Sequence, residues 1–69
     1  MTLDLEALND ELAQHDLVIM QQSNLRYAIF RIERGAIAAH GTHYDRYVRA
    51  RRESFATLAQ ALTAAEAMR

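Results

Sequence analysis

The chain contains no cysteine, no proline and no lysine, and only two of its 69 residues are glycine. Without cysteine, neither disulfide bridges nor a thiolate metal site can stabilise the fold. A domain of this length buries only about 60% of the surface that its unfolded chain exposes, so its stability depends on tight packing or on self-association. Without proline, any break in a helix has to be set by capping residues and by packing.

Long apolar segments are also missing. The longest purely apolar runs, at residues 17–20 and 36–39, have four residues each, whereas a membrane-spanning helix needs about 20. The first residues are acidic and lack the basic stretch and apolar run of a secretory signal. We therefore expect a cytoplasmic protein that does not contact a membrane. Because arginine supplies all the long basic side chains and alanine is abundant, we expect an accessory gene product of a bacterium, phage or plasmid.

The formal net charge is only −1, but its sign changes along the chain. Residues 1–16 carry acidic side chains and no arginine, whereas residues 17–52 carry seven arginines against Glu33 and Asp45. Such asymmetry is typical of a basic binding face. The simpler interpretation, which we favour, is that the acidic and basic segments neutralise one another within the molecule.

Residues 3–14 are predicted to form an amphipathic helix, because their apolar positions recur with a helical period and the others are mostly polar. Thr2 or Asp4 is the expected cap at its start. Two strands should follow, at residues 17–20 and 25–32, joined by a tight turn at Ser23-Asn24.

The second strand is apolar on both faces. Side chains alternate along a strand. One face of this strand therefore carries Leu25, Tyr27 and Ile29, and the opposite face carries Ala28, Phe30 and Ile32. The strand is therefore either covered on both sides or meets another chain on one of them. A homodimer is the expected solution, because the helices of so short a chain cover only one layer.

The segment Glu33-Arg34-Gly35 is predicted to be a hairpin loop that leads into a third strand at residues 36–40. From Thr42 onward the apolar spacing becomes helical. Either one helix covers residues 43–68, or two helices break near residues 53–56, and we favour the broken form. The candidate capping boxes are Thr42 with Asp45 and Thr57 with Gln60.

Residues 1–69 are therefore predicted to form one small α+β domain of order α-β-β-β-α, an antiparallel meander with the helices packed on one face. A single apolar cluster should form its core. Its predicted members are Leu8, Leu12, Ile19, Ile29, Phe30, Leu58 and Leu62.

Residues suited to catalysis are few. His40, His43 and Asp45 form the only metal-like group, but Gly41 and Thr42 separate the two imidazoles, so we predict no metal. There is no glycine-rich phosphate loop, no nucleophile elbow and no cysteine nucleophile. We expect no cofactor, no catalytic residues and no enzymatic activity.

The segment Arg46-Tyr47-Val48-Arg49-Ala50-Arg51-Arg52 is the sharpest functional feature. On a helix, Arg46, Arg49 and Arg52 would form one basic stripe with Tyr47 beside it. Arginine binds carboxylates and phosphates bidentately, and tyrosine stacks on bases. We predict that these four residues bind a partner. The alternative is that the arginines pair with acidic residues of the first helix.

These features favour a small non-enzymatic interaction protein, such as an adaptor, regulator or inhibitor, which occupies the surface of a protein partner. The alternative is a nucleic-acid-binding accessory protein that uses residues 46–52. The near-neutral composition argues against the alternative, because dedicated nucleic-acid domains are usually basic.

Overall fold

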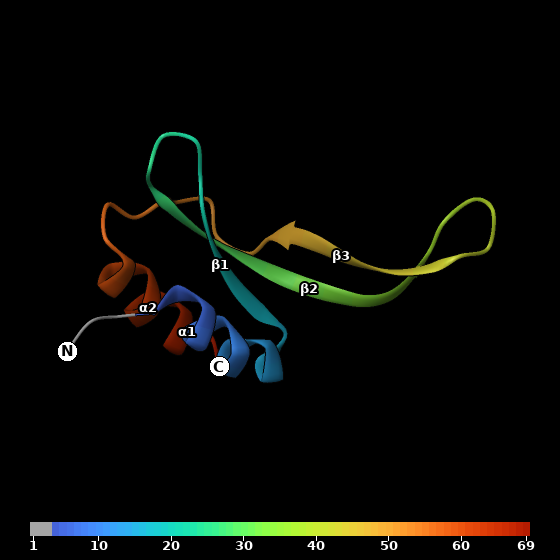
Figure 1. The fold of residues 1–69 in the computed structure, drawn as a ribbon, viewed down its shortest axis with the longest axis horizontal. Coiled ribbons are helices and arrows are strands. Elements are labelled where there is room, and N and C mark those ends of the chain that lie inside the picture. The colour runs from blue at the N-terminus through green and yellow to red at the C-terminus, as the bar shows by residue number, and fades with distance from the viewer. Residues whose placement is uncertain (1–3) are drawn as a thin grey trace.

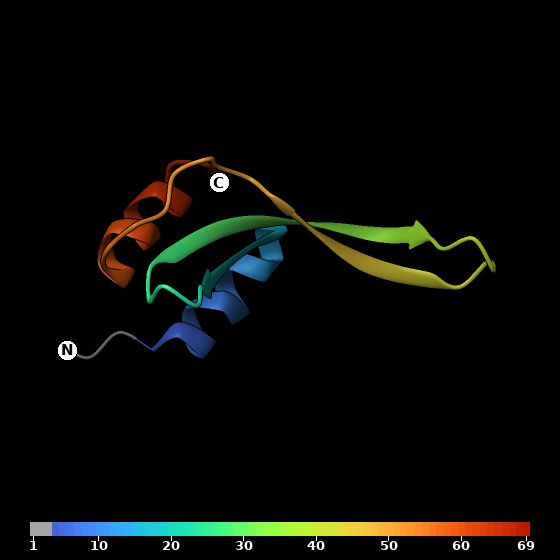
Figure 2. The same cartoon turned by 90° about the horizontal axis from the view of Figure 1, so that it is seen from above.

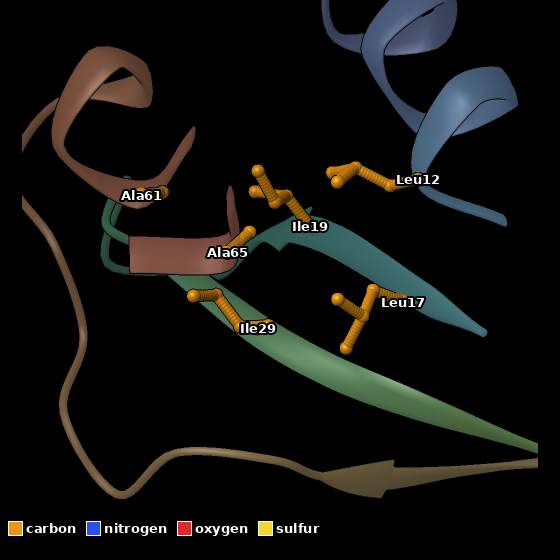
Figure 3. Packing of buried hydrophobic residues seen from close by; sticks show 6 residues of the cluster. All are labelled: Leu12, Leu17, Ile19, Ile29, Ala61 and Ala65. Carbon is orange, nitrogen blue, oxygen red and sulfur yellow. The ribbon is translucent and has the colours of Figure 1, made fainter. Parts of the chain in front are cut away.

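The computed structural model describes residues 4–69 as a three-stranded antiparallel sheet with helices before and after it (Figure 1). In chain order the elements are helix α1 (Leu5–Leu12), the short 3-10 helix η1 (Ala13–His15), strands β1 (Leu17–Gln21), β2 (Tyr27–Ile37) and β3 (His43–Arg49), and helix α2 (Leu58–Glu66). The strand order is β1-β2-β3, and both helices lie on the same side of the sheet (Figure 1 and Figure 3). The predicted α+β meander is confirmed.

The N-terminal helix forms as predicted and is capped by Asp4. A side-chain oxygen of Asp4 accepts the backbone N–H of Glu6 at 3.1 Å, which satisfies one of the free donors at the start of the helix. The α-helix ends at Leu12, and η1 carries the chain to Asp16, whose φ of 58° stops the helical path. The alternative cap, Thr2, lies outside the described residues.

The first hairpin joins β1 to β2, with Leu17 opposite Arg31 and Gln21 opposite Tyr27. The predicted turn lies in the right place, between these strands. The left-handed residue of this turn is Leu25, with φ of 65°, instead of Asn24, which tolerates that conformation better. The side chain of Leu25 is 72% exposed, so no packing compensates for the strain.

The second hairpin was predicted in the wrong place. Instead of forming a loop, residues 33–35 form a bulge inside β2, because Glu33 pairs with Arg46 and the next pair joins Ala36 to Tyr44. Two residues of β2 thus face one residue of β3. Gly35 has a φ of 74°, a conformation that glycine adopts without steric cost.

The predicted third strand at residues 36–40 is wrong as well. Strand β2 continues to Ile37, and the chain reverses in a turn at residues 38–42, where Ala38 N–H donates to Thr42 O at 3.0 Å. Gly41 has a φ of 86° in this turn. Gly35 therefore does adopt the left-handed conformation that was predicted for it, but the chain does not reverse there.

No helix forms at residues 43–52, so the continuous version is wrong, and of the favoured broken version only the second helix forms. Residues 43–49 pair with β2 as strand β3, so the hydrogen bonds offered by the neighbouring strand override a helical spacing of apolar residues. The C-terminal helix α2 is confirmed. The hydroxyl oxygen of Thr57 accepts the backbone N–H of Gln60 at 3.2 Å, as the predicted capping box requires.

The core lies between the two helices and the β1-β2 half of the sheet (Figure 3). Ile19 and Ile29 face each other across the two strands and are both 0% exposed. Ala61 and Ala65 are one turn apart on α2, and their small side chains allow the helix to approach the sheet closely. The buried cluster consists of Leu12, Leu17, Ile19, Ile29, Ala61 and Ala65.

Two predicted members are not part of this core. Phe30 is next to Ile29 in β2 and therefore points to the opposite face of the sheet, where it is half-buried. Leu8 is half-buried on α1. Leu58 and Leu62 pack against the buried cluster from α2. Among residues 4–69, no helix is long and apolar enough to cross a membrane.

Truncation at neighbouring positions of β2 should separate the two faces. We expect Ile29→Ala to lower the free energy of unfolding by about 2–5 kcal/mol, because it opens a cavity in the buried cluster. Phe30→Ala should cost clearly less, since its ring is partly solvated already. Urea denaturation of both variants measures the difference, and an equal loss would place Phe30 in the core after all.

Relief of the turn strain should stabilise the protein. A left-handed conformation costs an ordinary residue about 1–2 kcal/mol, and asparagine tolerates it better. Leu25→Asn is therefore expected to raise the free energy of unfolding by about 0.5–1 kcal/mol. A matched control is Ser23→Asn, which places asparagine at an exposed neighbouring position of the same turn and offers no such relief. Thermal denaturation that finds Leu25→Asn less stable than the parent would contradict the assignment.

Candidate interaction surface

The outer half of the sheet projects from the body as a two-stranded ribbon, which we define as residues 33–47 (Figure 1 and Figure 2). The molecule measures 44 × 24 × 19 Å, and its radius of gyration is 13.0 Å, against about 11 Å for a compact domain of this length. Every residue of β3 is exposed. The exposed large apolar side chains include Ile37 and Tyr44 on the ribbon.

The predicted arginine stripe is not a stripe. Because residues 46 and 49 are three apart on a strand instead of a helix, their side chains point to opposite faces of the sheet. Arg46 lies on the face that carries the helices, while Arg49 and Tyr47 lie on the other. Arg52 follows the end of β3 and is exposed. All four residues remain at the surface, but no single flat partner contacts them all from one side.

Two arginines of the ribbon form three ion pairs, one of which reaches Asp16 outside the ribbon. Arg46 donates from Nε to Glu33 Oε1 at 2.8 Å, and its Nη2 contacts the same oxygen. Arg34 donates from Nε to Asp16 Oδ1 at 2.7 Å and lies 3.6 Å from Asp45 Oδ2. The hydrogen bond from Arg34 to Asp16 raises the pKa of Arg34, and that from Arg46 to Glu33 raises the pKa of Arg46. Both guanidinium groups therefore stay charged.

Arg46 pairs with Glu33 of β2, and not with Asp4, Glu6, Asp10 or Glu11 of the first helix, as the predicted alternative required. Within the described residues, the ion pair that reaches α1 comes from the C-terminus, where Arg69 Nη1 lies 3.5 Å from Glu11 Oε1. Within residues 4–69, a single ion pair, Arg34 with Asp16, joins the acidic segment 1–16 to the basic segment 17–52. Exposed pairs of this kind contribute only about 0–1 kcal/mol each.

Arg49 organises the chain that follows β3. Its guanidinium lies 5.7 Å above the ring centroid of Phe30. Its Nε donates to Arg51 O at 2.9 Å, and its Nη2 donates to the carbonyl oxygens of Arg52 and Glu53. This side chain therefore covers part of the apolar face that no helix covers.

The two edges of the sheet differ. At the β1 edge, the side-chain amide of Asn9 forms two hydrogen bonds with one residue. Its Nδ2 donates to Ile19 O and its Oδ1 accepts Ile19 N–H, both at 2.8 Å. Asn9 thus occupies the place that a neighbouring strand would take, and its amide pairs with the outward N–H and C=O groups of Ile19 in the middle of β1.

The β3 edge has no such cover. Ala50 N–H donates to Ile29 O at 2.9 Å, and alternate residues of a strand direct their backbone groups to the same edge. Asp45, Tyr47 and Arg49 therefore direct their N–H and C=O groups away from β2. Within residues 4–69 no strand pairs with this edge.

Most of the common devices that block an edge strand are missing from β3. Proteins protect exposed edges with charged side chains, above all lysine, with proline or with a bulge in the edge strand, and β3 has only the charges of Asp45, Arg46 and Arg49. This chain has neither lysine nor proline, and the extra residue of its bulge is on the central strand β2. The β3 edge is therefore a template for a further strand.

The predicted metal-like group does not come together. His40 is in the turn of the ribbon, whereas His43 and Asp45 are on β3, and no cluster of three metal-binding side chains occurs within residues 4–69. A wide-open pocket of about 500 Å³ lies beside α2 and is lined by Phe55, Gln60, Thr63 and Ala64. None of these four lining residues carries an ionisable group.

Comparison with known proteins finds no match: no family model, no curated protein and no solved structure matches the chain. The surface therefore has to be interpreted from its own geometry. Sequence reasoning missed Asn9, which is one polar residue among many on α1, and it missed the β3 edge. The signal that could have revealed β3 is the strand preference of Tyr44, Tyr47 and Val48.

Loss of the Asn9 amide should weaken the fold. We expect Asn9→Ala to lower the free energy of unfolding by about 1–2 kcal/mol, because the N–H and C=O of Ile19 lose their partners. Asp10→Ala is the matched control, since Asp10 is an exposed neighbour on α1 and its change should stay within about 0.5 kcal/mol. Urea denaturation compares the two, and equal stabilities would show that Asn9 does not hold the edge.

Proposed function

We propose that this protein is a non-enzymatic interaction protein that binds its partner by strand addition at the β3 edge. In strand addition, an extended segment of the partner pairs with an open sheet edge, and main-chain hydrogen bonds supply affinity while flanking side chains supply specificity. The observation that carries the proposal is the contrast between the edges: Asn9 occupies β1, whereas β3 is open along its length.

The ribbon supports the same proposal. A two-stranded ribbon is at best marginally stable on its own in water, and this one extends beyond the part of the sheet that the helices cover (Figure 2). A third strand beside β3 would stabilise it by adding hydrogen bonds and by covering side chains. Tyr44 and Tyr47, which are 43% and 51% exposed, would supply contact area next to the added strand.

Specific roles follow for the four predicted binding residues. Tyr47 and Arg49 direct their backbone groups to the open edge and would form main-chain bonds with the partner. Arg46 and Arg52 would act through their side chains, at the centre of β3 and just past its end. The gene would belong to a bacterium, a phage or a plasmid, and the partner would be a protein in the bacterial cytoplasm. The chain would act on this partner as an adaptor, regulator or inhibitor.

Nucleic-acid binding receives less support. A two-stranded ribbon fits the major groove of DNA, but phosphate contacts need free basic side chains. Arg34 and Arg46 are already paired with acidic residues, and the ribbon also carries Glu33 and Asp45. The ribbon therefore has as many acidic as arginine side chains.

A pair of variants at one position tests the proposal. Tyr47→Pro removes one outward N–H, while proline is tolerated on the solvent side of an edge strand. Tyr47→Thr loses the same ring but keeps the N–H. We expect association through β3 to weaken by about 10-fold or more in the proline variant relative to the threonine variant, in line with about 1.5 kcal/mol for a main-chain hydrogen bond.

Capture from cells of the native host, with the three proteins as bait, provides the measurement, together with sedimentation of each bait alone. A protein retained by Tyr47→Thr and lost by Tyr47→Pro supports strand addition. If both variants retain the same partners and the same mass as the parent, binding does not use the β3 edge. Circular dichroism of both variants controls for folding.

A further inference from the structure

We propose that the strand added to β3 is β3 of a second copy of this chain, which pairs antiparallel to the first about a two-fold axis at Tyr47. This inference rests on the proposed function and names its partner. Two copies of one edge are equal in length and complementary in direction, so a two-fold axis lets both bind with the same residues. The question is whether the side chains of β3 suit such a pairing.

With the axis at Tyr47, three of the four outward-facing residues of β3 meet a suitable residue of the other copy, and His43 lies opposite the chain beyond the end of β3. Tyr47 lies opposite the partner's Tyr47, and Asp45 lies opposite the partner's Arg49, in both directions. These three residues direct their backbone groups to the open edge, so each of the three pairs exchanges two hydrogen bonds in the antiparallel pattern. Directly opposed side chains of opposite charge stabilise paired strands by about 0.2–1 kcal/mol.

Charge disfavours the neighbouring registers. If the axis moves by one residue toward the turn, Arg46 lies opposite its own copy, and a move of two residues opposes Asp45 to its own copy. Like charges directly opposite one another destabilise paired strands. A shift the other way places Asp45 opposite the partner's Arg51, which is beyond β3 and already bonded to Glu53. Only the axis at Tyr47 pairs both charges within the strand.

The side chains are available for these contacts. Asp45 and Arg49 are on the same face of the sheet, the one without helices. The hydrogen bonds of Arg49 within the chain use Nε and Nη2, which leaves Nη1 for a carboxylate of the second copy. Asp45 Oδ2 lies 3.6 Å from Arg34 Nη1, and the side chains of both residues are about half exposed. The Asp45 carboxylate is therefore accessible to a second copy.

The pairing also accounts for the length of the ribbon. In this register the turn at residues 38–42 of one copy lies beside residues 52–56 of the other, next to its folded body. Each ribbon thus becomes part of a continuous six-stranded sheet and gains a neighbour along its open edge. Two three-stranded sheets with exposed ribbons become one sheet with the ribbons at its centre.

Exchange of the two charges gives a decisive test. Asp45→Arg opposes two arginines at each pair, and Arg49→Asp opposes two aspartates. We expect the parent to sediment with twice its 7.9 kDa chain mass in the micromolar range, and each variant to associate about 10-fold or more weakly. An equimolar mixture of the two variants should recover the dimer, because both of its pairs again join opposite charges.

A single cysteine tests the axis itself, since the chain has no other cysteine. Residues in a hydrogen-bonded antiparallel pair have Cα atoms about 5.5 Å apart, within the range of about 4.4–6.8 Å that a disulfide spans. Tyr47→Cys should therefore form covalent dimers under mild oxidation. Tyr44→Cys is the matched control, because it is similarly exposed on β3 but lies several residues from its copy in this register.

Each possible result either supports the proposed pairing or overturns it. A parent that is monomeric throughout the micromolar range, a dimer unaffected by Asp45→Arg, or equal cross-linking of the two cysteine variants overturns the pairing. If Arg49→Asp fails to fold, since Arg49 also binds the carbonyl oxygens that follow β3, Asp45→Arg and the cysteine variants still decide. A monomer that captures another protein through an edge sensitive to Tyr47→Pro would overturn self-pairing and leave strand addition standing.

Discussion

The structure depends on a mismatch in strand length. The central strand β2 has 11 residues, whereas β1 has 5, and the two helices are short enough to cover only the part of the sheet that β1 reaches. The first half of β2 therefore pairs with β1 along residues 27–31 and has helices on one face, and β3 begins to pair with it only at Phe30. The second half has β3 alone. The position of the core, the projecting ribbon and the exposure of β3 all follow from this inequality.

The sequence indicates an element reliably where that element packs on the core. Helix α1, strand β1, the first half of β2 and the helix capped by Thr57 were predicted, because each shows a periodic apolar pattern that one buried face imposes. The ribbon buries no face, so its sequence is under no such constraint. The chance helical spacing of Tyr44 and Val48 then suggested a helix. Gly35 suggested a chain reversal at residues 33–35, whereas the chain reverses at residues 38–42.

The candidate site was predicted in part. The segment that contains Arg46, Tyr47 and Arg49 is at the surface, as expected, but its conformation decides which residues share a face. The functional meaning of Asn9 is beyond sequence reasoning, because it depends on the tertiary placement of one amide against one backbone residue of β1. The backbone direction of Tyr47 was equally hidden, since it follows from the register of β3 on β2.

The Asn9 amide also limits how far strands can accumulate. A sheet with two open edges accepts a strand on either side, and each added copy offers a new edge, so identical chains propagate into fibres. Here Asn9 holds the middle of one edge in every copy. Each chain therefore offers one open edge, that of β3, and the pairing of two β3 edges would leave neither of them open. A single asparagine makes any assembly through the remaining edge finite.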